Sequence, residues 1–454
     1  MGAMRDMTQG RIVRPLLLFA LPILLGIVLQ RLYNLFDTML VGRYIDQSAL
    51  AAVGSSGIVF TLLLTISHGF TNGFQIVIGQ HYGAKDEQNL KKAIAGTYLF
   101  GILIALGLSL FGIIFITPIL KLIQVPSEIF ESAKSYLLIL IIGVVFTVSY
   151  NMFSGILRAL GDSLMPLIFL IISVVLNIAL DFLFIVGLKQ GVKGAAVATV
   201  ISQAVSSLLC LVFVIFFRPE MHVKLSDFKV PKEIIKQLFS QGVAMALMFT
   251  VVDIGSVVLQ AGINSLGKEL IAGFTAGRKY LELMMLPGGA FATSAGTFVS
   301  QNYGAKQYSR IKRGLKYLIL ISWAWATLSC IVTYSAGYYL VTSITGQNAD
   351  LKIINAGLQY LKAGVPFYYS LYVLVIIRSS LQGINQKKLP LVASGIELFV
   401  KIAATSWLIP KLGFVVICFA EPVIWVLGML WVAPAFYLSL KKLSATEINS
   451  YPEQ

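Results

Sequence analysis

Long apolar blocks separated by short polar turns run along nearly the whole chain. Blocks of about 20 residues match the helix length needed to cross a hydrocarbon core of about 30 Å. A helix satisfies its own backbone hydrogen bonds in lipid, and the alternating segments of about 10 residues that a membrane barrel needs are absent from the sequence. The first six predicted spans are residues 14–43, 48–81, 90–117, 131–157, 164–187 and 192–217. The next six are residues 236–265, 270–302, 313–340, 354–384, 388–410 and 414–438. We therefore expect an all-α membrane protein with twelve transmembrane helices.

The composition and the placement of charge support this interpretation. Apolar residues make up 57 % of the 454 residues and charged residues only 12 %, about half the charged fraction of a typical soluble domain. The net charge of +15 could suggest a nucleic-acid partner. However, most Lys and Arg residues lie in the N-terminus, the even-numbered connections and the C-terminus, as the positive-inside rule requires. We expect no nucleic-acid partner, and a multi-pass protein of the inner (plasma) membrane with both termini in the cytoplasm. A basic cluster after the eighth span is a candidate contact for anionic lipid: Lys306, Arg310, Lys312, Arg313 and Lys316.

The two halves of the chain resemble each other. Three pairs match at separations of 221 to 224 residues: 80–85 with 301–306, 157–167 with 381–391, and Gly191 with Gly413. Six spans return the chain to its starting side, so the halves should be related by a pseudo-two-fold axis along the membrane normal. The predicted divisions are an N-lobe over 1–217, a cytoplasmic linker over 218–235, a C-lobe over 236–440 and a cytoplasmic C-terminal tail over 441–454.

The repeated motif QxYGAK closes the second and the eighth span. We expect each copy to be a helix C-terminus with glycine as the cap, Gly83 or Gly304, because glycine commonly takes the left-handed conformation there. Lys85 and Lys306 would then face the cytoplasm.

Polar residues inside the spans of the first half suggest a shared pocket. An ionisable group near a helix centre costs about 2.5–3.5 kcal/mol on insertion scales, so it needs a partner or a purpose. Asp37 lies within the first span, and Asn177 and Asp181 are four residues apart on one face of the fifth. With no obvious basic neighbour, both carboxyls are candidates for reversible protonation. The alternative is that they only hydrogen-bond neighbouring helices. The candidate cation-coupling residues are Asp37, Asn151, Asn177, Asp181 and Thr199.

The second half places different residues at the corresponding positions. Asp37 corresponds to Val257 at a separation of 220 residues, close to the repeat separations, and Asn177 corresponds to Lys401 at 224. Glu397 stands one turn before Lys401, at the spacing of an intrahelical ion pair, which favours fixed scaffolding. Other polar and adaptable side chains of both halves are candidates for a substrate cavity: Tyr136, Tyr150, Glu282, Met285, Tyr369 and Glu421.

Motifs of soluble enzymes are absent from the sequence. It contains no Walker A sequence, GxSxG elbow, HExxH motif or paired cysteines. We therefore predict no enzyme, no catalytic residue, no resident metal and no cofactor. Uphill transport would have to draw on an ion gradient.

In their order and spacing, these residues resemble the multidrug and toxic compound extrusion (MATE) family over essentially the whole chain. The resemblance rests on the six-plus-six plan, the QxYGAK ends, LRALGD after span four and LNIALDFLFI in span five. It points to the bacterial DinF-like branch, in which Asp37, Asn177, Asp181 and Thr199 would match an N-lobe network that binds a proton or a sodium ion. The coupling ion could therefore be a sodium ion bound at Asp37 and Asp181, although we favour a proton. A cation site in the C-lobe, as in the NorM-like branch, is not expected. Span ten has no acid, and on span seven the position that corresponds to Asp37 is Val257.

The family resemblance implies a monomeric drug–cation antiporter that alternates between outward- and inward-facing V-shaped states. Its substrates would be small amphipathic, often cationic molecules, with membrane lipids as further partners. The alternative, from the same superfamily, is a flippase for a lipid-linked cell-envelope precursor. A flippase would use a cationic cavity, for which the sequence offers Arg278, Lys279, Arg378 and Lys401.

Overall fold

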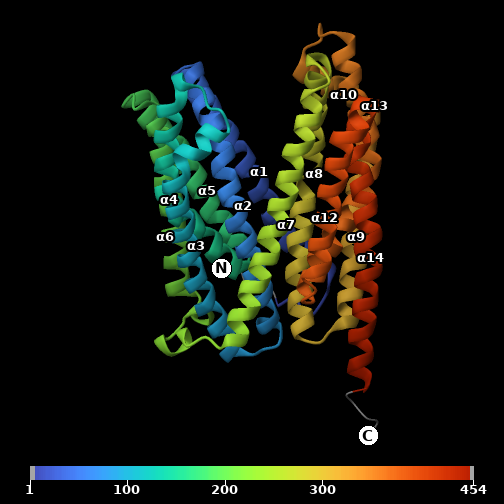
Figure 1. The fold of residues 1–454 in the computed structure, drawn as a ribbon. Coiled ribbons are helices and arrows are strands. Elements are labelled where there is room, and N and C mark those ends of the chain that lie inside the picture. Colours follow the sequence, from blue (N-terminus) through green and yellow to red (C-terminus); the bar gives the residue numbers. More distant parts are fainter. Residues whose placement is uncertain (1–5, 450–454) are drawn as a thin grey trace. The chain divides into compact units, whose positions relative to one another are not determined.

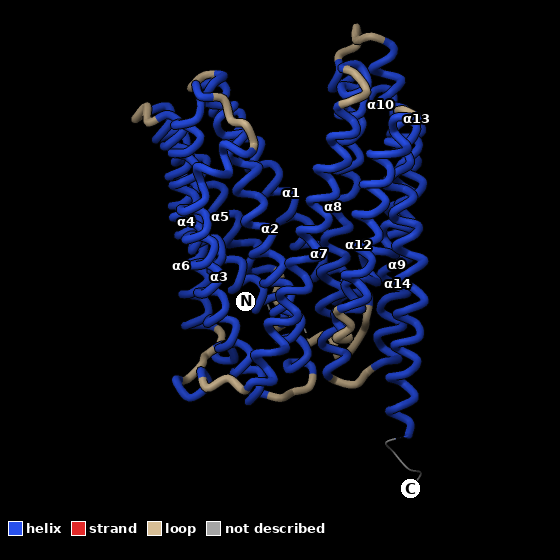
Figure 2. The backbone as a smooth tube through the Cα atoms, in the orientation of Figure 1, coloured by secondary structure: helices blue, strands red, loops and turns tan. Residues whose placement is uncertain are grey.

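The computed structural model describes residues 6–449, which form helices and connecting turns without any strand (Figure 1 and Figure 2). The first half contains α1 (Val13–Tyr44), α2 (Gln47–Gly83), α3 (Glu87–Leu122), α4 (Ser127–Ala159), α5 (Leu164–Asp181), the π-helical turn η1 (Phe182–Gly187) and α6 (Gly191–Phe217). Two 3₁₀ turns follow, η2 (Pro219–Met221) and η3 (Leu225–Phe228). The second half begins with α7 (Lys232–Asn264), α8 (Lys268–Gly304) and α9 (Tyr308–Thr345). It ends with α10 (Leu351–Gly364), η4 (Val365–Phe367), α11 (Tyr368–Gly383), α12 (Lys388–Ala403), η5 (Ala404–Leu408), α13 (Ile409–Leu412) and α14 (Phe414–Asn449).

Each of the twelve predicted spans coincides with a long helical stretch, so the predicted all-α class is confirmed. The tenth span runs through α10, η4 and α11, and the eleventh through α12, η5 and α13. Within residues 6–449, eleven stretches are long and apolar enough to cross a membrane. The eighth, α8, does not reach that apolarity because charged side chains such as Arg278, Lys279 and Glu282 interrupt it.

The ends of α2 and α8 correct one expectation. Gly83 and Gly304 close the last helical turn, and the left-handed residue is the following lysine, with φ 55° at Lys85 and 56° at Lys306. The amide of each lysine donates to the carbonyl of the tyrosine three residues back, at 3.1 and 3.0 Å. The prediction that glycine would be the cap is therefore wrong. The helix continues through the glycine, and the lysine two residues later takes the capping conformation.

The repeat is also visible elsewhere in the backbone. Gly161 (φ 90°) and its counterpart Asn385 (φ 65°) are both left-handed, as are Gly191 (61°) and Gly413 (62°). The π-helical turns η1 and η5 occupy corresponding places after α5 and α12. Corresponding positions therefore take the same irregular turns in both halves, even where their residues differ.

The described chain divides into two compact units. Leu21–Ala246 forms most of the first unit, and Met7–Ala20 with residues 247–449 forms the second. The division falls inside α1 and α7 rather than within 218–235, because the first part of α7 packs against α2. A Cβ atom added to Gly73 would come within 2.6 Å of the backbone of Gly242. The lobe borders inferred from the repeat remain predictions. The predicted tail begins inside α14, and its residues 450–454 lie outside the described residues.

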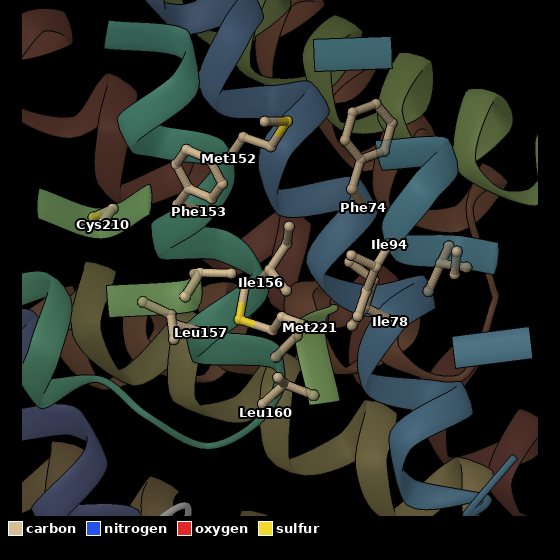
Figure 3. Close-up of a cluster of buried hydrophobic side chains, with 14 of the residues drawn as sticks. Phe74, Ile78, Ile94, Met152, Phe153, Ile156, Leu157, Leu160, Cys210 and Met221 are labelled. Atoms are coloured by element: carbon tan, nitrogen blue, oxygen red, sulfur yellow. The ribbon is translucent and has the colours of Figure 1, made fainter. Parts of the chain in front are cut away.

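The core of the first unit joins α2, α3, α4 and α6. Figure 3 shows Phe74 and Ile78 of α2, Ile94 of α3 and Met152 of α4 in one buried cluster. Met221, from the turn after α6, also lies in this cluster. The linker is therefore anchored to the body of the first unit.

Arg310 lies in the first turn of α9, in the second unit, and does not have the exposure expected of a lipid contact. It is buried, and its guanidinium donates to the carbonyls of Met7 (3.0 Å), Gln9 (2.7 Å) and Gly10 (2.8 Å). Backbone carbonyls take three of its five N–H donors and the side chain is buried, so Arg310 does not fit the expected role of a contact for anionic lipid.

Candidate functional site

A cavity of about 700 Å³ lies within the first unit, lined by residues of α1, α2, α4, α5 and α6. Four of the five candidate coupling residues line it: Asp37, Asn151, Asn177 and Thr199. The two tyrosine candidates of the first half, Tyr136 and Tyr150, line it as well. The lining residues include one histidine, His68, and neither lysine nor arginine. The cavity is thus polar, and its carboxyl group has no basic residue beside it in the lining.

Asp37 is the acid of this lining. Its side chain is 8 % exposed, and its Oδ1 accepts no hydrogen bond from residues 6–449. None of the ion pairs among the described residues involves Asp37. Arg31, less than two turns earlier, is exposed and is not part of the lining. A buried carboxyl without a cationic partner is free to exchange a proton or a metal cation.

A chain of hydrogen bonds connects α5, α6 and α1 along the cavity wall, and three of its four residues, Asn177, Thr199 and Tyr33, line the cavity. With its amide nitrogen turned toward the carboxyl, the orientation that satisfies both groups, Asn177 donates to Oδ2 of Asp181 (2.9 Å) and accepts from the Thr199 backbone N–H (3.3 Å). The Thr199 hydroxyl shares a hydrogen bond with the Tyr33 hydroxyl (3.0 Å). Asp181 is 1 % exposed and is close enough to Asp37 for the two carboxyls to interact electrostatically. Asn177, Asp181 and Thr199 thus form one hydrogen-bonded network with Tyr33, and Asp37 lies near it without a hydrogen bond to its Oδ1.

The local fold explains why α5 contributes two residues to this network. Asn177 and Asp181 are four apart, so they lie on one face of the helix. Immediately after Asp181 the helix widens into the π-helical turn η1. Such turns are frequent at functional sites.

Tyr150 and Asn151 lie next to each other on α4. The Tyr150 hydroxyl donates to the Pro166 carbonyl (2.9 Å), which fixes its ring beside the start of α5. The Asn151 Nδ2 is buried and donates to no described residue. Tyr150 is therefore held in place, whereas Asn151 keeps an amide group available to the cavity.

The corresponding positions of the second half are occupied by an ion-pair cluster. Lys401, the counterpart of Asn177, donates to Glu397 (2.9 Å) and to the Ser256 hydroxyl (3.3 Å). Arg378 lies 3.7 Å from Glu397. The predicted Glu397–Lys401 pair is confirmed.

The remaining substrate candidates belong to the second unit, and none lines the cavity of the first. Glu282 is paired with Arg278 at 2.8 Å. Glu421 accepts a hydrogen bond from the Tyr360 hydroxyl at 3.4 Å. The Tyr369 hydroxyl shares a 2.8 Å hydrogen bond with Thr327, and Met285 is half-buried. The structure therefore brings together the candidates of the first half, while these four stay among their own neighbours.

Several lining residues were missed by the sequence reasoning, and helical spacing could have found them. Tyr33 lies one turn before Asp37, and Gln203 lies one turn after Thr199. Ser173 lies one turn before Asn177, where its hydroxyl donates to the Ser202 carbonyl (2.9 Å). Side chains four residues apart share a helix face, so each known lining residue indicates the next.

The donor set of the network consists of carboxyl, amide and hydroxyl oxygens. Oxygen ligands of this kind suit a proton or a hard cation such as sodium rather than a transition metal. No group of three or more His, Cys, Asp or Glu residues that could hold a metal ion occurs among the described residues.

Comparisons with known proteins agree with this architecture. The MatE family model matches twice, over residues 22–183 and 244–407, which confirms the internal repeat. The chain is 28 % identical over 368 residues to the probable multidrug resistance protein YpnP of Bacillus subtilis (strain 168), covering 80 % of each protein. Its fold is similar to a crystal structure of MATE in the bent conformation, with a TM-score of 0.90, 21 % identity and coverage of 97 % and 98 % of the two chains. It is also similar to a multidrug resistance MATE transporter in an outward-facing conformation, with a TM-score of 0.88, 21 % identity and coverage of 96 % and 98 %. The family model matches both halves of the predicted six-plus-six plan, and the chain therefore belongs to the MatE family of multidrug efflux transporters.

Proposed function

We propose that this protein is a proton-coupled antiporter that exports amphipathic, often cationic compounds by alternating access. The observation that carries the proposal is Asp37, a buried carboxyl without an ion-pair partner on the wall of a cavity without lysine or arginine. The similarity to a probable multidrug resistance protein supports the substrate class. We further propose a monomer in the inner membrane with both termini in the cytoplasm.

Substrate export is coupled to proton entry through the charge of the Asp37 carboxyl. With Asp37 deprotonated, the cavity attracts a cationic, amphipathic compound, and Tyr136 and Tyr150 offer aromatic surface to it. A proton that binds Asp37 from outside removes this charge, and substrate binding weakens. Asn177, Thr199 and the network to Asp181 hold the site in shape. For a neutral compound, the unit charge of a proton moving inward across 100 mV supplies about 2.3 kcal/mol for concentrative export. When one proton exchanges for one monovalent cation, the two charges cancel and the pH difference alone drives export.

A flippase for a lipid-linked precursor would need unpaired cationic side chains to bind the pyrophosphate group of its substrate. In the second unit Arg278 is paired with Glu282, and Lys401 and Arg378 lie beside Glu397. Lys279 is exposed on α8. Three of the four cations therefore lie against acids, with Glu397 shared by two of them, which favours the multidrug antiporter.

The coupling ion is tested by transport in proteoliposomes loaded with a fluorescent lipophilic cation. A pH gradient and a sodium gradient are imposed separately at the same membrane potential. We expect the pH gradient alone to drive transport. Transport that requires sodium and ignores the pH gradient would contradict proton coupling, and would favour a sodium ion bound at Asp37 and Asp181.

The role of Asp37 is tested with Asp37→Asn. The amide keeps the size of the side chain but cannot exchange a proton, so we expect gradient-driven transport to fall about 100-fold or more, in the range typical of losing a proton-transfer group. The matched control is Asp46→Asn, which removes the same charge at the N-cap of α2, where asparagine caps equally well. The control should transport normally. Unchanged transport by Asp37→Asn at normal abundance would remove the carboxyl from the mechanism.

A further inference from the structure

A second cavity, of about 560 Å³, opens on the first unit between α3, α4, α6 and the linker that follows α6. None of the candidate coupling or substrate residues lines it. Its walls are mostly apolar, and Ile102 and Ile215 among them are 57 % and 50 % exposed. Both residues belong to helices that can cross a membrane. Exposed apolar side chains on such helices face hydrocarbon, so the cavity is a groove open to the lipid phase.

The linker builds one end of this groove. Met221 is 1 % exposed and lies in the cluster with Met152 and Phe153, both of which line the groove (Figure 3). The His222 Nε2 lies 3.1 Å from the Val214 carbonyl and 2.9 Å from that of Ile215, in the last turn of α6. Both partners are acceptors, so Nε2 donates, and the ring holds the turn η2 against the helix end. Figure 1 shows this segment turning back beneath α6. The groove is therefore formed before any ligand arrives.

The residues beyond this end have the character of a membrane interface. Leu225 in η3 is 90 % exposed, and Phe228 is also exposed. Lys224 and Lys229 flank this turn and are exposed. Asp227, the acid between them, accepts from the Lys224 backbone N–H at 2.7 Å. Exposed apolar side chains between basic residues are typical of a segment lying among lipid headgroups.

We propose that this groove is a binding site for one anionic phospholipid, with an acyl chain between α3, α4 and α6 and the headgroup at Lys224 and Lys229. The volume falls within the range of about 300–1,000 Å³ found for ligand sites. The apolar wall selects a chain, and the two lysines select a negative headgroup. The site goes beyond the proposed transport function, because no residue of the coupling network takes part.

The experiment uses the full-length protein in liposomes that contain a diazirine-bearing phosphatidylglycerol or a phosphatidylcholine with the same acyl chains. Crosslinks are mapped by mass spectrometry. We expect phosphatidylglycerol to label residues 211–223 preferentially over the lipid-facing segment 106–115 of α3. Removing both lysines, as Lys224→Gln with Lys229→Gln, should lower this labelling about fivefold or more, since basic residues near the surface attract anionic lipid. The charge-matched control is Lys121→Gln with Lys352→Gln, which should label normally.

The position of the acyl chain is tested with Ser149→Phe, which fills the groove from α4. Its control is Leu106→Phe, at an exposed position of α3 outside the groove. We expect only Ser149→Phe to lose labelling. If Ser149→Phe does not fold, titration of delipidated wild-type protein with each lipid, followed by native mass spectrometry, tests the same selectivity. Equal labelling by both lipids, or full labelling of Ser149→Phe, would overturn the proposal. So would displacement of the lipid by a transported dye, because the groove would then be a substrate entry.

Discussion

At the residue scale, two acids inside the helices of this protein, Asp37 and Glu397, differ in their partners. Asp37 has no cation beside it in the cavity lining, whereas Glu397 lies 2.9 Å from Lys401 and 3.7 Å from Arg378. The charge of Glu397 is balanced in every state that keeps these contacts. The charge of Asp37 is balanced only when a proton or a cation binds. The same chemical group therefore serves as scaffold in one half and as a candidate coupling site in the other.

We predict that Glu397→Gln destabilises the protein strongly, because it leaves the buried Lys401 and the half-buried Arg378 without their acid. Breaking a buried ion pair typically costs about 3–5 kcal/mol. The measurement is thermal unfolding of the purified protein in detergent, where we expect a clear fall in the midpoint.

The control for this effect is the double variant Glu397→Gln with Lys401→Met. It removes one of the two stranded charges and should recover part of the lost stability. A Glu397→Gln protein that unfolds at the wild-type temperature would show that the cluster does not hold the second unit together.

At the element scale, glycines set how closely two helices approach within the first unit. A Cβ atom on Gly73 of α2 would lie 2.6 Å from backbone atoms of Gln241 and Gly242 in α7. Backbone atoms cannot move aside as a flexible side chain can. The contact between α2 and the first part of α7 therefore depends on the absence of a side chain.

We predict that Gly73→Ala destabilises the first unit by about 1–3 kcal/mol, the usual cost of overpacking. Gly107→Ala on α3 is the matched control, since an added Cβ there meets nothing within 4 Å. Both substitutions gain the same helix propensity, so the difference between their unfolding temperatures isolates the steric clash. Equal unfolding temperatures would contradict the close approach of α2 and α7.

At the scale of the whole molecule, the start of the described chain is fixed by residues nearly 300 positions away. Arg310 donates to the carbonyls of Met7, Gln9 and Gly10, and the Met7 N–H donates to Gln301 at 3.0 Å. All of these residues belong to the second unit. A segment that precedes the first helix is thus part of the core formed by the second half of the chain.

We predict that Arg310→Met releases this segment while keeping an unbranched apolar stem in place. A hydrogen bond to a charged group contributes about 1.5–3 kcal/mol, so amide exchange of residues 7–10 should accelerate by at least about tenfold. Hydrogen–deuterium exchange with mass spectrometry measures the change. Arg313→Met, an exposed position one turn later in chain order, serves as the control and should leave exchange unaltered. Protection of residues 7–10 in Arg310→Met would show that other contacts hold the segment.

Much of the fold follows from local patterns. The apolar blocks predict all twelve helical stretches, because burial of a helix in lipid depends on length and hydropathy within one segment.

The candidate site could be predicted from the sequence only in part. Asp37, Asn151, Asn177 and Thr199 were found because polar residues in apolar spans are rare, and all four line one cavity. Tyr33 was missed because a tyrosine in a span looks like ordinary packing until its hydroxyl is placed beside Thr199.

The amino-acid sequence alone determines the class, the duplication and the short list of intramembrane polar residues, since these depend on composition and on spacing along one chain. Only the tertiary structure decides which of those residues meet. It brings Asn177, Asp181, Thr199 and Tyr33 into one hydrogen-bonded network and places Arg310 under an N-terminal segment. It also shows that the units divide inside α1 and α7. The physical reason is that packing and hydrogen bonding join residues far apart in sequence, and the period of a single helix carries no record of its neighbours.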